Sequence, residues 1–220
     1  MDLLFGGLNS VCGIMAMDCP DLTIKGNTFN NMGTGIGLMQ SELFPSQGYG
    51  EIPYSTYHVL GNSLDGCSNG VAAIGGRLEL RDNCSTNSFL PYMICGILSM
   101  GSGEGEDKWL RIIGIGNNTG SSECIEACVI MNAVLECDLP TPQPGELVYL
   151  VLGQLSTSPE APVTIQPGVV IKFMNIDTPS RLNVRGPFSA AREASQPGIF
   201  FTSWLDGSVG GRRSTADSCL

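Results

Sequence analysis

The chain has 220 residues, of which 42% are hydrophobic and only 15% are charged, and its formal net charge is −10. The hydrophobic share suffices for a sizeable core, and the lack of a concentrated basic region argues against nucleic acid as a partner. No span approaches the roughly 20 apolar residues of a membrane helix. The start, MDLLFGGLNS, lacks the basic n-region of a signal peptide. We therefore expect neither membrane insertion nor an export signal in this chain.

Two short patterns alternate along residues 1–138. A strand leads to an asparagine in LTIKGNTF, HVLGNSL, LELRDNCS and IIGIGNNT, and a glycine stands near the start of a strand in CGIMAM, TGIGLM, NGVAAI and CGILSM. The uninterrupted unit is 21 or 22 residues long. A period this short, made of strands and corners, predicts a parallel β-helix, a solenoid of about six to eight coils for this length.

Stacked coils would place equivalent residues about 4.8 Å apart. Asparagine tolerates the left-handed backbone of a corner, and stacked amides can bond along a column. The sequence thus predicts an asparagine ladder made of Asn27, Asn62, Asn83 and Asn117. Four independent turn residues are the alternative. Inward positions should form columns of like residues, and outward positions should be polar.

Two long intervals in the repeat indicate insertions at 41–57 and 99–109, which leave the same segment of the unit about two coils apart. Long loops on one side of a rigid solenoid often carry binding residues. Their aromatic rings could stack on sugars, and their acids could hold calcium or sugar hydroxyls. The candidate ligand-binding residues are Tyr49, Glu51, Tyr54, Tyr57, Glu104, Glu106, Asp107 and Trp109. Loops that merely cover the coil edges are the alternative.

The nine cysteines follow the repeat in part, since Cys12 and Cys95 both stand before a Gly-Ile pair. Recurrence at coil positions favours small apolar side chains in the core. Disulfides are one alternative. A zinc site from Cys124, Cys128 and Cys137 is another, although it lacks a fourth ligand. No cofactor other than calcium is expected.

The C-terminal third begins after a proline-rich stretch at 139–147, which predicts a loop or module boundary. Coils are expected again over 148–211, followed by a polar tail at 212–220. In TIQPGVVIKF (164–173), Pro167-Gly168 predicts a corner, and the β-branched run after it predicts a strand.

Residues 147–211 also resemble a segment of bacterial extracellular right-handed parallel β-helix proteins of the pectin-lyase-like superfamily. The resemblance rests on Thr164-Ile165, the Pro-Gly corner, VVIKF, the strand LNVRG at 182–186, Ala190-Ala191, the Phe-Thr-Ser group at 201–203 and the Asp/Gly-rich turn at 206–211. It implies a right-handed β-helix and a secreted or cell-surface location in a parent protein. In that family the Asp/Gly-rich turn leads into further coils and the chains are exported. The present chain is therefore expected to be a fragment of a longer secreted protein, with a complete small protein as the alternative.

The same resemblance is weak for activity. Polygalacturonase-like members carry Asn-Thr-Asp, Asp-Asp, Gly-His-Gly and Arg-Ile-Lys motifs, none of which occurs here, and the only histidine is His58 in YHVLG. Arg77, Glu79 and Arg81 are interpreted as alternating charges on an outer strand face. We therefore expect no catalytic residue and a structural or carbohydrate-binding role, with a polysaccharide lyase or glycoside hydrolase fragment as the alternative. The oligomeric state is left open.

Overall fold

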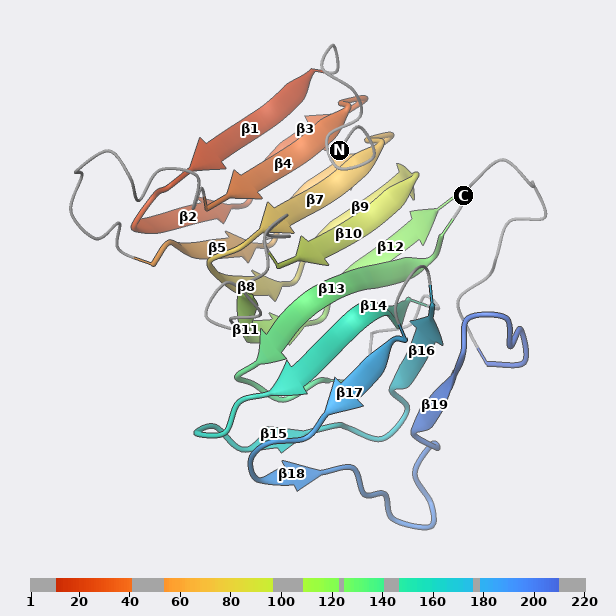
Figure 1. Ribbon diagram of the computed structural model, residues 1–220. Coiled ribbons are helices and arrows are strands. Elements are labelled where there is room, and N and C mark those ends of the chain that lie inside the picture. The colour runs from red at the N-terminus through yellow and green to blue at the C-terminus, as the bar shows by residue number, and fades with distance from the viewer. Residues whose placement is uncertain are drawn as a thin grey trace.

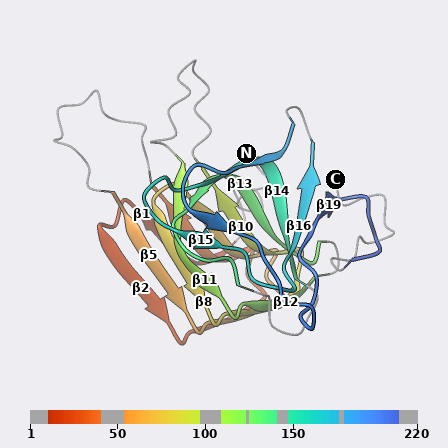
Figure 2. The same ribbon diagram turned by 90° about the horizontal axis from the view of Figure 1, so that it is seen from below.

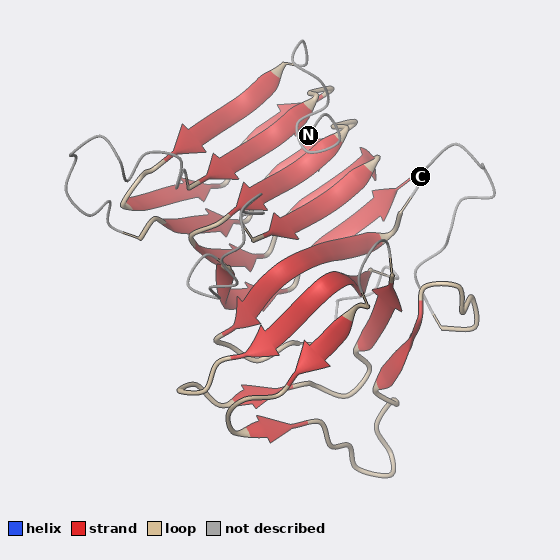
Figure 3. Cartoon of the chain, viewed as in Figure 1, coloured by secondary structure: helices blue, strands red, loops and turns tan. Residues whose placement is uncertain are grey.

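The computed structural model describes residues 11–40, 54–96, 109–122, 125–140, 147–175 and 179–209. Within these ranges the regular secondary structure consists of β-strands alone, and all strand pairs are parallel. The strands wind into a right-handed parallel β-helix (Figures 1 and 3). The predicted fold is confirmed.

The first face of the solenoid is a ladder of eight strands, one for each successive coil. Each strand pairs with its equivalent in the next coil. In order they are β1 (Cys12–Met17), β4 (Thr34–Met39), β7 (Asn69–Ile74), β10 (Leu90–Cys95), β13 (Ala127–Leu135), β14 (Val148–Thr157), β16 (Val170–Met174) and β19 (Phe200–Ser203).

The second face follows the first around a corner (Figure 2). It contains β2 (Asp21–Lys25), β5 (Thr56–Leu60), β8 (Arg77–Arg81), β11 (Leu110–Gly116), the second halves of β13 and β14, and β17 (Arg181–Asn183). β13 and β14 run through this corner, where Asn132 (φ 49°) and Gly153 (φ 85°) adopt the left-handed backbone.

The third face is shorter. Its N-terminal part stacks β3 (Thr28–Asn30), β6 (Ser63–Asp65), β9 (Cys84–Ser88) and β12 (Thr119–Ser122). Near the C-terminus, β15 (Val163–Thr164) pairs with β18 (Phe188–Ser189). The three faces enclose one continuous core that runs along the solenoid axis.

The core contains columns of inward side chains, as expected. On the first face one such column runs through all eight coils. Its members are Ile14, Ile36, Val71, Tyr92, Cys128, Tyr149, Ile171 and Phe201. All of them are buried except the first, Ile14, which is partly buried, and the last, Phe201. Each buried aliphatic side chain in such a column contributes about 1.5–3 kcal/mol through removal of its surface from water. Phe201 is half exposed in the last described rung.

The outer side of the first face differs from the expectation that outward positions are polar. There a second apolar cluster lies on the opposite side of the same strands; its buried members are Ala72, Leu90, Met93, Ile125, Ala127, Val129, Val148, Leu150 and Trp204. The continuous apolar runs NGVAAI and ACVIMNAVL are typical of parallel strands that are covered on both sides. Alternation of buried and more exposed side chains therefore holds in β2, β5 and β8 of the second face, and is lost in β4, β7 and β10 of the first.

The recurring glycines are required because two strands of each coil approach closely. A Cβ on Gly13 would lie 2.5 Å from Cδ1 of Phe29, and one on Gly35 would clash with Leu64. Phe29 and Leu64 are core residues of the third face. In the fourth coil the small and the large residue change places. The larger Pro91 stands on the first face, and the residue that it approaches on the third face is Gly120 of β12.

This packing corrects the predicted equivalence of Cys12 and Cys95. Asn69 pairs with Leu90, and Cys95 pairs with Ile74 at the far end of the strand. The fourth repeat of the glycine pattern is therefore Leu90-Pro91-Tyr92 and not Cys95-Gly96. Sequence comparison missed it because proline occupies the small-residue position.

The corner at Pro167-Gly168 has the predicted form. Gly168 has φ 89°, its N–H donates to the carbonyl oxygen of Gly198 at 3.0 Å, and β16 begins two residues later. Lys172 interrupts the apolar run of β16, yet it has no exposed surface. Its Nζ donates to the carbonyl oxygen of Asp206 at 2.6 Å and lies 5.6 Å from the centre of the Trp204 ring. Burial lowers the pKa of Lys172.

The carboxylate of Asp206 stabilises the turn that follows β19, and we expect this stabilisation to depend on pH. It accepts hydrogen bonds from the Ser208 hydroxyl (2.6 Å), the Thr202 hydroxyl (2.7 Å) and the Ser208 N–H (2.9 Å), which lower its pKa from 3.8 to about 2. The stabilisation is complete above pH 3.8 and is lost as the pH falls from 3.8 to about 2. Melting curves of the wild type and Asp206→Asn should therefore converge across this window. A difference that does not change with pH would contradict the assignment.

Candidate functional site

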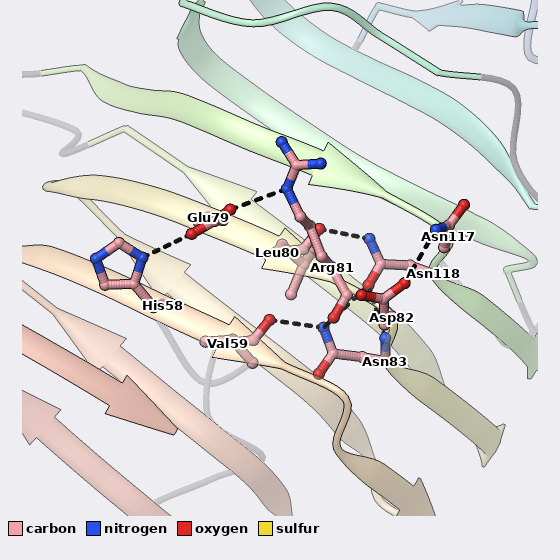
Figure 4. A network of polar contacts seen from close by, with 9 residues as sticks. All are labelled: His58, Val59, Glu79, Leu80, Arg81, Asp82, Asn83, Asn117 and Asn118. Atoms are coloured by element: carbon pink, nitrogen blue, oxygen red, sulfur yellow. Dashed lines mark hydrogen bonds and ion pairs between the residues drawn. The ribbon is translucent and has the colours of Figure 1, made fainter. Parts of the chain in front are cut away.

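The asparagine ladder is built from four coils, but its last member is not the one expected. Asn27, Asn62 and Asn83 each donate from the backbone N–H and from Nδ2 to the Oδ1 of the next amide, at 3.0–3.1 Å. The fourth amide belongs to Asn118. Asn117 instead points outward and donates to the carboxylate of Asp82 at 3.0 Å (Figure 4).

The backbone explains this one-residue correction. In each coil the residue directly before the ladder asparagine has positive φ; these residues are Gly26 (67°), Gly61 (59°), Asp82 (57°) and Asn117 (52°). Asparagine is among the few side chains that tolerate this region. In the pair Asn117-Asn118 the first residue therefore makes the left-handed turn, and the second enters the ladder.

The ladder corrects the insertion lengths as well. Its steps span 35, 21 and 35 residues. Both long coils thus exceed the short one by the same 14 residues, whereas the sequence spacing predicted a shorter second insertion. The insertions leave after β4 and β10, which are two rungs apart on the first face. The coil between them turns tightly at Gly75 (φ 67°) and Gly76 (φ 78°).

The ends of the two insertions meet at the second face. The hydroxyl of Tyr54 donates to the carbonyl oxygen of Trp109 at 2.9 Å, which joins the residues before β5 and β11. Tyr54 as a whole residue remains 36% exposed, and Trp109 is partly exposed. Of the predicted binding residues, these two are the ones that the structure brings together on the surface.

The other predicted binding residues do not join them. Tyr57 is fully buried, and its hydroxyl donates to the carbonyl oxygen of Met39 at 2.6 Å, so it cannot stack on a sugar. It belongs to β5 and not to the insertion, because strand alternation directs it into the core. The remaining five lie outside the described residues; they are Tyr49, Glu51, Glu104, Glu106 and Asp107.

Next to Tyr54 the outer side of the second face carries two arginines that share one carboxylate. Arg77 and Arg111 are register partners on β8 and β11. Both bind Glu136: Arg77 Nη2 lies 3.1 Å from Oε2, and Arg111 Nη1 pairs with Oε1. Burial acts to lower the pKa of Arg111, but the hydrogen bond and charge of Glu136, with help from Tyr54, outweigh it and raise this pKa. We name Tyr54, Trp109, Arg77, Arg111 and Glu136 the arginine–tyrosine cluster.

A second charged group lies on the same face of the solenoid and includes His58, Glu79 and Arg81 (Figure 4). Nδ1 of His58 lies 2.7 Å from Glu79 Oε2, and Nε2 lies 3.6 Å from Asp21 Oδ1. The other oxygen of Glu79 lies 2.9 Å from Nε of Arg81. The expected alternation of charges is therefore a connected network across three coils. His58 in this network and Glu136 in the arginine–tyrosine cluster were not foreseen, because only the stacking register shows that they lie next to the charges of β8.

Glu136→Gln tests how far the arginine–tyrosine cluster is held by charge. Because the Glu136 side chain is only 15% exposed and the two guanidinium groups would lose their shared anion, we expect a loss of about 1 kcal/mol in the free energy of unfolding. The loss should shrink at high salt. Chemical denaturation at two ionic strengths measures it, with Glu193→Gln in an exposed loop as the control for charge alone. A salt-independent loss equal to the control would show that the pairs add nothing.

The cysteines lie mostly in or beside the core. All seven in the described ranges are free thiols, and Cys67, Cys95 and Cys128 are buried. Burial raises the pKa of Cys95 to about 11 and the pKa values of Cys128 and Cys137 to about 12, so these thiols are protonated and unreactive. Cys124, needed for the zinc alternative, lies outside the described residues, and no group of three metal-binding side chains occurs within them.

Comparison with known proteins adds no relative. No family model, curated protein or solved structure matches this chain. Within the part of the chain that the structure describes, no helix has the length and apolarity needed to cross a membrane.

Proposed function

We propose that this chain is a rigid, non-catalytic solenoid segment of a secreted or cell-surface protein, and that it binds glycan on its second face. The arginine–tyrosine cluster carries the proposal. Tyr54 and Trp109 offer aromatic surface for the apolar face of a sugar ring. Beside them, two guanidinium groups and a carboxylate supply donors and an acceptor in fixed positions, which suit sugar hydroxyls.

The β-helix supplies the rigidity that such a site needs. Tyr54 and Trp109 precede strands that stack in the same sheet, and the ion pairs join residues from β8, β11 and the segment after β13. Holding these side chains in advance lowers the entropy lost on binding. The resemblance of residues 147–211 to extracellular β-helix proteins supports the location and the ligand class.

A glycan array with and without calcium tests the proposal. We expect binding that falls about tenfold in Tyr54→Ala, as loss of one stacked aromatic would give. Phe200→Ala is the matched control, because Phe200 is an exposed aromatic residue on the last described strand. Absence of binding to every glycan, or equal losses in both variants, would reject the site. Cleavage of a bound glycan would replace the binding role by the lyase or hydrolase alternative.

A further inference from the structure

The asparagine ladder ends at Asn118 with two donors that have no ladder partner. Asn118 accepts both bonds from Asn83 and donates from Nδ2 to the carbonyl oxygen of Leu80 at 2.7 Å. At each lower step, the backbone N–H and the second Nδ2 proton converge on one oxygen of the next coil. Among the described residues, these two donors of Asn118 have no acceptor. Leaving buried donors unpaired is costly.

A small cavity lies at this end of the ladder. It has a volume of about 20 Å³ and is lined in part by Asn118, Tyr92, Tyr149, Ile115 and Cys128. One water molecule needs roughly 10–15 Å³ measured in this way, so the cavity accommodates one and little more. Asn118 contributes polar atoms to a wall that is otherwise mostly apolar.

The hydroxyl of Tyr92 adds a second imbalance at the same place. It lies 2.9 Å from the carbonyl oxygen of Asn83 and 2.7 Å from that of Thr119, but its single proton can be donated to only one of them. The hydroxyl oxygen therefore keeps lone pairs for a further donor, while the carbonyl oxygen of Asn83 already accepts the N–H of Thr119 at 2.8 Å. The two donors of Asn118 and this hydroxyl are partners that a buried water uses.

We propose that a single buried water molecule occupies this cavity and replaces the side-chain oxygen of a fifth ladder asparagine. It accepts from the N–H and Nδ2 of Asn118 and donates toward Tyr92 and a neighbouring carbonyl oxygen, which gives the usual number of about three bonds. The next coil then needs no asparagine. Its corner carries Leu139 and Pro140, and proline has no N–H with which to extend a ladder.

A crystal structure of the full chain, at a resolution that shows ordered waters, tests the proposal directly. We expect one density peak about 3.0 Å from both nitrogens of Asn118. An empty cavity, or a protein group that accepts these bonds, would overturn it. Crystals soaked in bromide distinguish water from a halide, since an anomalous peak in the cavity would show that an anion and not water occupies the site.

Cavity filling gives an independent test in solution. Cys128→Val enlarges a side chain that lines the cavity, and Cys67→Val makes the same change at a buried position elsewhere in the core. Displacing a bonded water leaves the Asn118 donors unpaired, so Cys128→Val should lower the melting temperature more than Cys67→Val does. A melting temperature above that of the wild type would overturn the proposal, because a dry cavity gains stability when filled.

Discussion

Asn83→Leu should lower the free energy of unfolding by about 3–5 kcal/mol. Asn83 lies in the middle of the ladder and is almost fully buried. The substitution removes the acceptor for two bonds from Asn62 and the donors to Asn118 and to the carbonyl oxygen of Val59. Leucine has nearly the same size, so the loss comes from buried polar groups left without partners. Urea denaturation followed by circular dichroism measures the change.

The neighbouring pair Asn117-Asn118 offers a matched control for this prediction. Asn118→Leu should also be strongly destabilising, whereas Asn117→Gly should change stability by less than about 0.5 kcal/mol, since glycine suits the left-handed backbone that Asn117 adopts. The opposite order would place Asn117 in the ladder and would refute the register of the fourth coil.

Gly70→Ala should destabilise the protein by about 3 kcal/mol, or prevent folding, because one added methyl group meets backbone as well as side chain. A Cβ on Gly70 would collide with the hydroxyl of Ser85 and with the carbonyl oxygen of Pro91 in the next coil. The carbonyl oxygen of Pro91 cannot move away without breaking the strand pairing between β7 and β10. Thermal melting and expression level report the effect.

Gly207→Ala is the control for this substitution. A Cβ at Gly207 has no atom within 4 Å, and Gly207 does not have positive φ. Its effect should therefore lie within about 0.5 kcal/mol. If Gly70→Ala were equally mild, the two strands of the coil would not be in close contact, and the explanation given for the recurring glycines would fail.

The fold could be predicted from the repeat because the residues at its corners and in its strands have clear local conformational preferences. Asn27, Asn62 and Asn83 each follow a short strand, and the run after Gly168 is a strand because β-branched residues favour it. Corner residues and strand residues obey short-range rules of backbone conformation. Such rules operate within a few residues, so the coil length and the parallel β-helix can be inferred without knowing any long-range contact.

Which residues are neighbours was decided only by the stacking of coils. Asn118 replaces Asn117, Pro91 replaces Gly96, Tyr57 enters the core, and Glu136 binds two arginines from other coils. The first two are shifts of one and five residues in register, and several alignments of so short a repeat are locally equivalent. The tertiary structure selects among them because only one register fills the core, pairs the buried amides and leaves room between Gly70 and Pro91.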